Sequence, residues 1–169
     1  MRLGIILFVY MKDELAFKTA YGKKLEEAEL ILEIKQFIDA DEKFPYKVLV
    51  GTDSERHHEY VDFVSVIVVH RVGMGARYFW RRTILHEKME MQKRLWQEAL
   101  DSLDVSKELL KLLVDIKDSF SFEMHIDVGK NGKSQTVMSE IANLVRGYGV
   151  EFKFKPHAYA ASTIADRLI

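Results

Sequence analysis

The chain has 169 residues, 48% of them hydrophobic, which suffices for one compact domain with a single core. Its 25 basic and 26 acidic residues give a formal net charge of -1, so a polyanionic partner would have to be met by a local basic patch. The absence of cysteine excludes disulfides, thiolate zinc sites and cysteine nucleophiles, and it fits a reducing, cytoplasmic setting.

The opening stretch from Leu3 to Met11 is apolar but too short to span a bilayer, and no signal-peptide cleavage pattern follows it. We expect a short strand there, or an extra leader ahead of Met11. No membrane association is predicted. Residues 1–23 are therefore interpreted as an N-terminal extension, and residues 24–169 as a single domain.

The remaining elements alternate between strands and helices. Residues 24–40 predict an amphipathic helix, and the apolar run 46–52 predicts a central strand that stops at Asp53. Two β-branched and aromatic strands follow, joined as a hairpin across Gly73-Met74-Gly75. Residues from about 87 to 117 predict helix, either one long piece or two joined near residues 101–104. A strand over 120–126, a helix over 134–146, a strand in EFKFK and a terminal helix in ASTIADRLI complete the order. Because strands separated by helices pair in parallel, we predict an α/β domain with a mixed sheet.

The loop after the fourth strand, HIDVGKNGKSQT, contains the glycines, lysines and serine of a phosphate-binding loop. A P-loop requires G-x-x-x-x-G-K-[ST], and Asp127 occupies the position of its first glycine. A carboxylate there would repel a phosphate. We therefore interpret the glycines as turns and Asp127 as the residue that carries the chemistry.

Asp53 and Asp127 each follow a predicted central strand. If the two strands are parallel neighbours, the carboxylates lie side by side and raise each other's pKa unless a cation lies between them. Mg²⁺ prefers such oxygen ligands. The alternative is that each aspartate only caps a turn or a helix.

Glu98 interrupts the apolar stripe of the long helix. The stripe consists of Met91, Leu95, Glu98, Ser102, Val105, Leu109, Leu112 and Ile116. A charge facing the sheet would need a metal or a basic partner. A second stripe would turn Glu98 toward solvent; it consists of Met89, Trp96, Ala99, Leu100 and Leu103. Glu90 and Asp101 are rival acids on the same segment.

Four acids in this order of elements resemble the ribonuclease H-like superfamily. The matching positions are Asp53 in VGTDSER, Glu98 in LWQEAL, Asp127 in HIDVGK and Asp166 in IADRLI. More narrowly, GTDS, DVGKNGKS, KPHAYAAS and ADR resemble the YkuK-like family of uncharacterised bacterial proteins. The resemblance runs from about Lys24 to the C-terminus. It implies a five-stranded mixed sheet of order 3-2-1-4-5 with helices on both faces.

The resemblance also implies phosphodiester hydrolysis with two Mg²⁺ or Mn²⁺ ions, about 4 Å apart and shared by the four acids. Ser54, Lys130, Lys133 and Ser134 would then bind a nucleic-acid phosphate, aided by the N-terminus of the following helix. Ser54 stands where ribonuclease H has a glycine, and no clear basic handle follows, so specificity for RNA/DNA hybrids is not implied. The alternative is a non-catalytic nucleic-acid-binding module that retains the fold.

Overall fold

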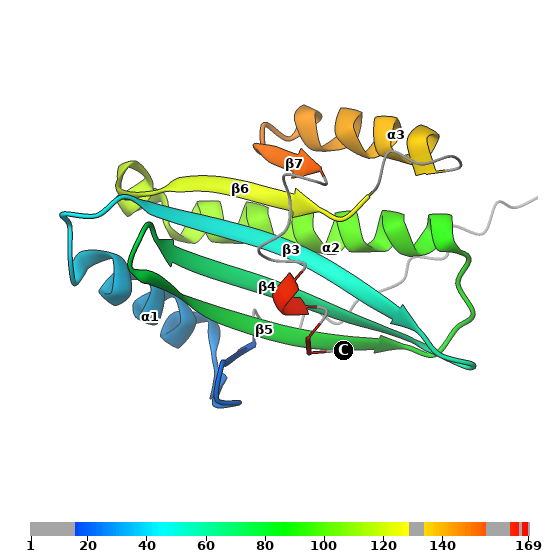
Figure 1. The fold of residues 1–169 in the computed structure, drawn as a ribbon, viewed down its shortest axis with the longest axis horizontal. Helices are drawn as coiled ribbons and strands as arrows, with labels where there is room; N and C mark the ends of the chain where they lie inside the picture. The colour runs from blue at the N-terminus through cyan, green and yellow to red at the C-terminus, as the bar shows by residue number, and fades with distance from the viewer. Residues whose placement is uncertain (1–15, 129–133, 155–162, 166, 169) are drawn as a thin grey trace, which may run out of the picture.

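The computed structural model describes residues 16–128, 134–154, 163–165, 167 and 168. The described strands form one seven-stranded mixed sheet of order β2-β1-β5-β4-β3-β6-β7 (Figure 1). The strands are β1 (Phe17–Thr19), β2 (Lys24–Leu25), β3 (Tyr46–Arg56), β4 (Val61–Arg71), β5 (Gly75–Leu85), β6 (Ser121–Ile126) and β7 (Phe152–Phe154). The helices are α1 (Glu27–Asp39), α2 (Met91–Leu112), the 3-10 helix η1 (Val114–Ser119) and α3 (Ser134–Gly147).

The number of strands differs from the prediction. The five predicted strands lie in the predicted order, as β5-β4-β3-β6-β7, but β1 and β2 extend the sheet beyond β5. β1 pairs with β5 through Lys18 and Trp80, so part of the segment expected to be an extension contributes to the sheet. Strands of three and two residues are too short to produce a periodic pattern in the sequence. The apolar stretch from Leu3 to Met11 lies outside the described residues.

The end of the first central strand also differs. β3 does not stop at Asp53 but continues to Arg56, and Asp53 pairs with Val64 of β4. The polar residues after Asp53 indicate a turn by composition, yet the antiparallel partner strand satisfies their backbone groups and keeps them extended. Asp53 therefore lies inside a hairpin strand rather than at its end.

Helices cover both faces of the sheet, as predicted. α1 and α2 share one core cluster with β3 and β4, and α3 packs against α2 and β6 on the same face. The helical residues Thr163 to Ala165 lie on the opposite face, where Ala165 packs with Val64 and Val66 of β4 (Figure 1). Within the described part of the chain, no helix is long and apolar enough to cross a membrane.

Local chemistry sets the ends of two elements. The side chain of Glu29 accepts a hydrogen bond of 3.0 Å from the backbone N–H of Glu26, which satisfies a donor at the start of α1. Between β4 and β5 the turn needs a left-handed backbone, and Gly73 supplies it with a φ of 83°. The hairpin predicted across Gly73-Met74-Gly75 is confirmed.

Candidate functional site

Asp53 and Asp127 lie on neighbouring parallel strands. β3 pairs with β6 in a register that ends at Gly51 opposite His125. Asp53 and Asp127 each follow the last pair of this ladder by two residues, Asp53 still within β3 and Asp127 directly after the end of β6. Side chains alternate along a strand, so Asp53 shares a face with Leu49, which packs in the cluster that contains Ala165. Both aspartates therefore belong to the face that carries the C-terminal helical residues.

Glu98 lies on the helix-covered face and is buried, with 6% of its surface exposed. Its carboxylate oxygen Oε1 accepts a hydrogen bond of 2.5 Å from the hydroxyl of Ser54. The backbone N–H of Ser54 also donates to Oδ1 of Asp53, at 2.8 Å. Ser54 therefore connects the two acids. The inward position predicted for Glu98 is confirmed, but Met91 of the same stripe is exposed and Ile116 lies beyond α2, in η1. Ala99 and Leu103 of the second stripe are buried as well, because α3 packs against that side of α2.

The ionisation of Glu98 links three of the predicted acids. The pKa of Glu98 is raised to about 8, chiefly by burial and also by the negative charges of Asp53 and Asp127. The Ser54 hydrogen bond and the positive charge of Arg94 oppose the rise. At neutral pH the Glu98 carboxyl thus holds a proton unless a cation replaces it. The three acids form one electrostatic group.

This group is not arranged as a complete metal site. Among the described residues, no three His, Cys, Asp or Glu side chains are placed to hold one metal ion together. Glu98 approaches from the helix face, whereas Asp53 and Asp127 belong to the opposite face. Asp166, Lys130 and Lys133 lie outside the described residues, and of Ser134 only its place as the first residue of α3 is described.

A cluster of buried hydroxyls positions Glu98 over the sheet. Thr52 of β3 lies 2.9 Å from the hydroxyl of Ser65 and accepts a hydrogen bond of 3.0 Å from Ser102 of α2. Two residues further along β3 and four residues back along α2, Ser54 donates its hydrogen bond to Glu98. Two residues of an extended strand cover about 6.7 Å, and four residues of a helix cover about 6 Å. A helix that runs antiparallel to a strand can therefore place every fourth helix residue near every second strand residue. The Thr52–Ser102 pair therefore sets the register that brings Glu98 to Ser54.

Arg94 is a site residue that the sequence analysis missed. Its Nη1 donates to the backbone carbonyl of Ser54 at 3.4 Å, and its charge lowers the pKa of Glu98. Arg94 precedes Glu98 by four residues on α2, which places both on one side of the helix. That spacing is the signal that could have identified it.

The rival acids do not join this group. Glu90 is exposed and lies at the residue before α2 begins. Asp101 accepts a hydrogen bond of 2.8 Å from Gln97, and burial raises the pKa of Asp101 to about 6. Neither is among the groups that shift the pKa of Glu98.

A second polar group lies along β6, toward its start. Glu123 accepts a hydrogen bond of 2.8 Å from Lys153 and lies 3.9 Å from Nζ of Lys47. His125 Nε2 lies 3.4 Å from the same carboxylate. Burial lowers the pKa of His125 and outweighs the attraction of Glu123, so this imidazole is neutral near pH 7. His125 precedes Asp127 by two residues and therefore lies on the same side of the strand.

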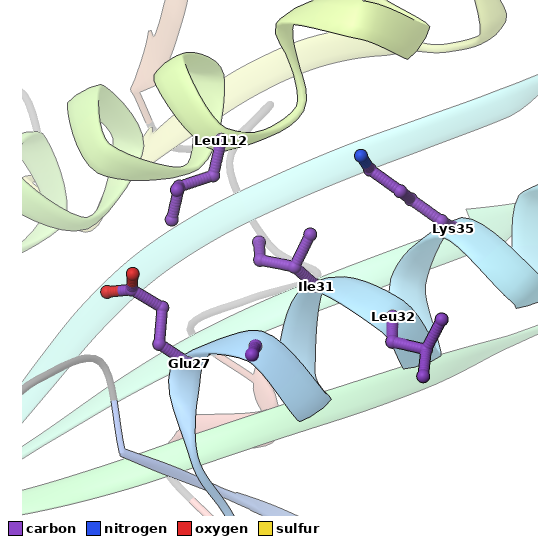
Figure 2. A pocket seen from close by; sticks show the side chains of 6 residues that line it. Glu27, Ile31, Leu32, Lys35 and Leu112 are labelled. Atoms are coloured by element: carbon purple, nitrogen blue, oxygen red, sulfur yellow. The ribbon is translucent and has the colours of Figure 1, made fainter.

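An apolar groove between α1 and α2 is a separate feature (Figure 2). It is lined by Glu27, Ala28, Ile31, Leu32, Lys35 and Leu112. Leu112 follows Glu98 by fourteen residues on one helix, a separation of about 21 Å. The groove therefore lies away from the acids.

Comparisons with known proteins agree with this architecture. The family model described as "Ribonuclease H-like" matches residues 29–169. A relative from Bacillus subtilis (strain 168), "Uncharacterized protein YkuK", is 28% identical over 170 residues, which cover 93% of this chain and 98% of the relative. No solved structure gives a significant match. From the match over residues 29–169 and the order of the strands, the chain belongs to the ribonuclease H-like family.

Proposed function

We propose that the protein is a metal-dependent nuclease that hydrolyses phosphodiester bonds in RNA or DNA. The observation that carries the proposal is the buried Glu98, whose pKa is raised by burial and by the charges of Asp53 and Asp127. Carboxylates gathered in this way need a proton or a cation between them. In a ribonuclease H-like fold, divalent ions are the cations that would turn such a group into a catalytic site.

The donor chemistry of the group fits Mg²⁺ or Mn²⁺, because all of its proposed ligands are carboxylate oxygens. Asp53, Glu98, Asp127 and Asp166 are the proposed ligands of two ions. Bound there, the ions would supply an activated water and stabilise the leaving oxygen. Ser54 would orient the carboxylates of Asp53 and Glu98 through the two hydrogen bonds it already donates.

Substrate phosphate would be bound next to Asp127. Lys130 and Lys133 follow Asp127 in the chain, and Ser134 is the first residue of α3. A helix N-terminus attracts phosphate through its unpaired N–H groups and its dipole. We therefore propose Lys130, Lys133, Ser134 and Ser54 as the groups that position the phosphodiester, while the acids hold the ions.

The test is cleavage of labelled oligonucleotides by the purified full chain in Mg²⁺ or Mn²⁺. Single-stranded, duplex, hybrid and junction substrates are compared, each with an EDTA control. We expect ion-dependent cleavage that falls by at least about a hundredfold in Asp53→Asn and in Asp127→Asn, because each variant removes a ligand charge. The exposed Glu140 on α3 gives the matched control, and Glu140→Gln should cleave like the wild type.

Cleavage that persists in both aspartate variants would contradict the proposed site. A protein that binds nucleic acid but never cleaves it would instead be a non-catalytic binding module. One observation favours that second function: Glu98 lies on the helix-covered face, where Ser54 donates a hydrogen bond to it, whereas Asp53 belongs to the opposite face with Leu49. Its signature is a mobility shift that weakens with salt and survives Asp53→Asn, because phosphate contacts would then carry the affinity.

A further inference from the structure

The β3–β4 hairpin extends past the acids and ends in a tip rich in rings. β3 runs three residues beyond Asp53, about 10 Å, before β4 returns from Val61. The backbone N–H of His57 donates to the carbonyl of Tyr60 at 2.9 Å, which closes the tip. In Figure 1 this tip lies at the end of the sheet where β5 leaves toward the start of α2.

Three rings from two segments lie together at this tip, and we call them the ring cluster: His57, Tyr60 and His86. The rings of His57 and Tyr60 are stacked, with centroids 4.3 Å apart and an angle of 22° between their planes. His86, from the connection between β5 and α2, lies 6.0 Å from Tyr60 at 54°. Tyr60 is therefore the inner ring, and the two histidines are the outer ones.

The ring cluster is held by a rigid base but is not part of a core. Val61, next to Tyr60, pairs with Leu85, next to His86, and Val61 belongs to a small buried cluster. The rings themselves remain accessible: His86 is exposed, and the His57 side chain is 34% exposed. Stacked rings that keep outer surfaces in water present flat apolar area to a planar ligand.

Charge at the tip is balanced rather than basic. Arg56 and Lys88 are exposed there, but Glu55 lies 3.7 Å from His57, and Glu87 pairs with Lys93 at 2.8 Å. Glu59 is exposed on the same turn. A phosphate backbone would gain little from this surface, so the rings, and not the charges, would carry recognition.

We propose that the ring cluster is a stacking platform for unpaired bases, and that the substrate of the neighbouring acids is therefore a single-stranded nucleic acid or a single-stranded end. This inference rests on the proposed function and names its substrate class. The spacing suits it, because His57 follows Asp53 by four residues, about 13 Å along an extended strand, so a base on the ring cluster would belong to a nucleotide close to the one at the acids. Bases stack on aromatic rings without regard to sequence, whereas paired bases inside a duplex keep their faces covered.

The experiment measures binding by the full chain carrying Asp127→Asn, which prevents cleavage during the measurement. Fluorescence anisotropy gives the Kd for an unstructured single strand, for a blunt duplex and for an abasic strand of equal length. The double substitution His57→Ala and His86→Ala should raise the Kd for the single strand at least about fivefold, the low end of the loss of one stacked base. The Kd values for the duplex and the abasic strand should not change.

Two further variants separate stacking from damage to the fold. His57→Phe retains a flat ring and should bind the single strand at least as tightly as the parent protein. His70→Ala, at the opposite end of β4, should leave binding unchanged. An unchanged Kd for the single strand in the double variant, or an equal loss on the abasic strand, would overturn the inference.

Failure of this inference is distinguishable from failure of the proposed function. Wild-type cleavage that requires Asp53 and Asp127, together with ring-independent binding, would overturn the stacking platform alone. Ring-dependent binding by a protein that cleaves no substrate would overturn the nuclease alone.

Discussion

At the scale of single residues, Glu98 determines what the candidate site requires. A glutamate at 6% exposure loses most of its hydration, and two further carboxylates add repulsion. The hydrogen bond from Ser54 and the positive charge of Arg94 stabilise the ionised carboxylate in part, but the pKa of Glu98 still rises to about 8. The folded protein therefore favours either a protonated Glu98 or a bound cation.

The pH dependence of stability follows from this shift. The unfolded pKa of Glu98 is 4.5 and the folded pKa about 8, so its contribution to stability is fully present below 4.5 and is lost as the pH rises through 8. Between pH 6.5 and 8 the free energy of unfolding should fall by roughly 1.7 kcal/mol, at about 1.4 kcal/mol per pH unit near pH 6.5 and about half of that at pH 8. Urea unfolding in EDTA measures this fall, and Glu98→Gln should remove it.

The pH window above 6.5 keeps two other groups out of the measurement. The pKa of Asp101 is raised to about 6, so the stability that Asp101 contributes at acidic pH is nearly all lost by pH 6.5. The pKa of His125 is lowered, so the titration of His125 changes the free energy of unfolding only at more acidic pH. Glu140→Gln, on the exposed side of α3, should keep the wild-type slope. If the free energy of unfolding falls equally steeply with pH in the wild type and in Glu98→Gln, then Glu98 is not the group that the fold holds neutral.

At the scale of elements, the contact between α2 and β3 depends on hydroxyls at positions where an apolar core would have methyl groups. Thr52→Val keeps the shape of the side chain but leaves the hydroxyls of Ser65 and Ser102 without their shared partner. The free energy of unfolding should fall by about 1–3 kcal/mol, the cost of unpaired buried polar groups. Equilibrium urea unfolding measures this free energy. The control Thr136→Val, on the exposed side of α3, should change the free energy of unfolding little.

A double-mutant cycle distinguishes a hydrogen-bond network from simple packing. If Thr52 and Ser102 interact, Thr52→Val combined with Ser102→Ala costs less than the sum of the single substitutions, because the second change removes a group already unpaired. Strict additivity would contradict the assignment of these hydroxyls to the α2–β3 register.

The same elements explain what the sequence could predict. Long periodic segments and β-branched runs predicted α1, α2 and the β4–β5 hairpin, and the inward turn of Glu98 followed from its place in the stripe. The extension of β3 to Arg56 could not be read locally, because it depends on pairing with β4. β1 was missed because three residues carry no period, and Arg94 because its partner carbonyl belongs to a distant strand.

At the scale of the whole molecule, the acids belong to segments that meet only in the folded chain. Asp53 lies in β3, Glu98 in α2 and Asp127 directly after β6. The unfolded chain separates these carboxylates by tens of residues and binds divalent ions weakly. An ion that binds the folded group should therefore stabilise the entire fold.

Thermal unfolding tests this linkage. Mg²⁺ or Mn²⁺ at about 100 times its Kd should add about 2.7 kcal/mol, which raises the Tm of a chain of this size by roughly 5–10 °C. Asp127→Asn should abolish the rise. In EDTA at pH 8 the same variant should be at least as stable as the wild type, because the charge of Asp127 opposes ionisation of Glu98. Glu140→Gln should keep the full ion-dependent rise at matched ionic strength. An equal ion-dependent rise in the Tm of Asp127→Asn would show that the ions bind elsewhere on the molecule. If the ions do not raise the Tm of the wild type, the proposed site does not bind a divalent cation.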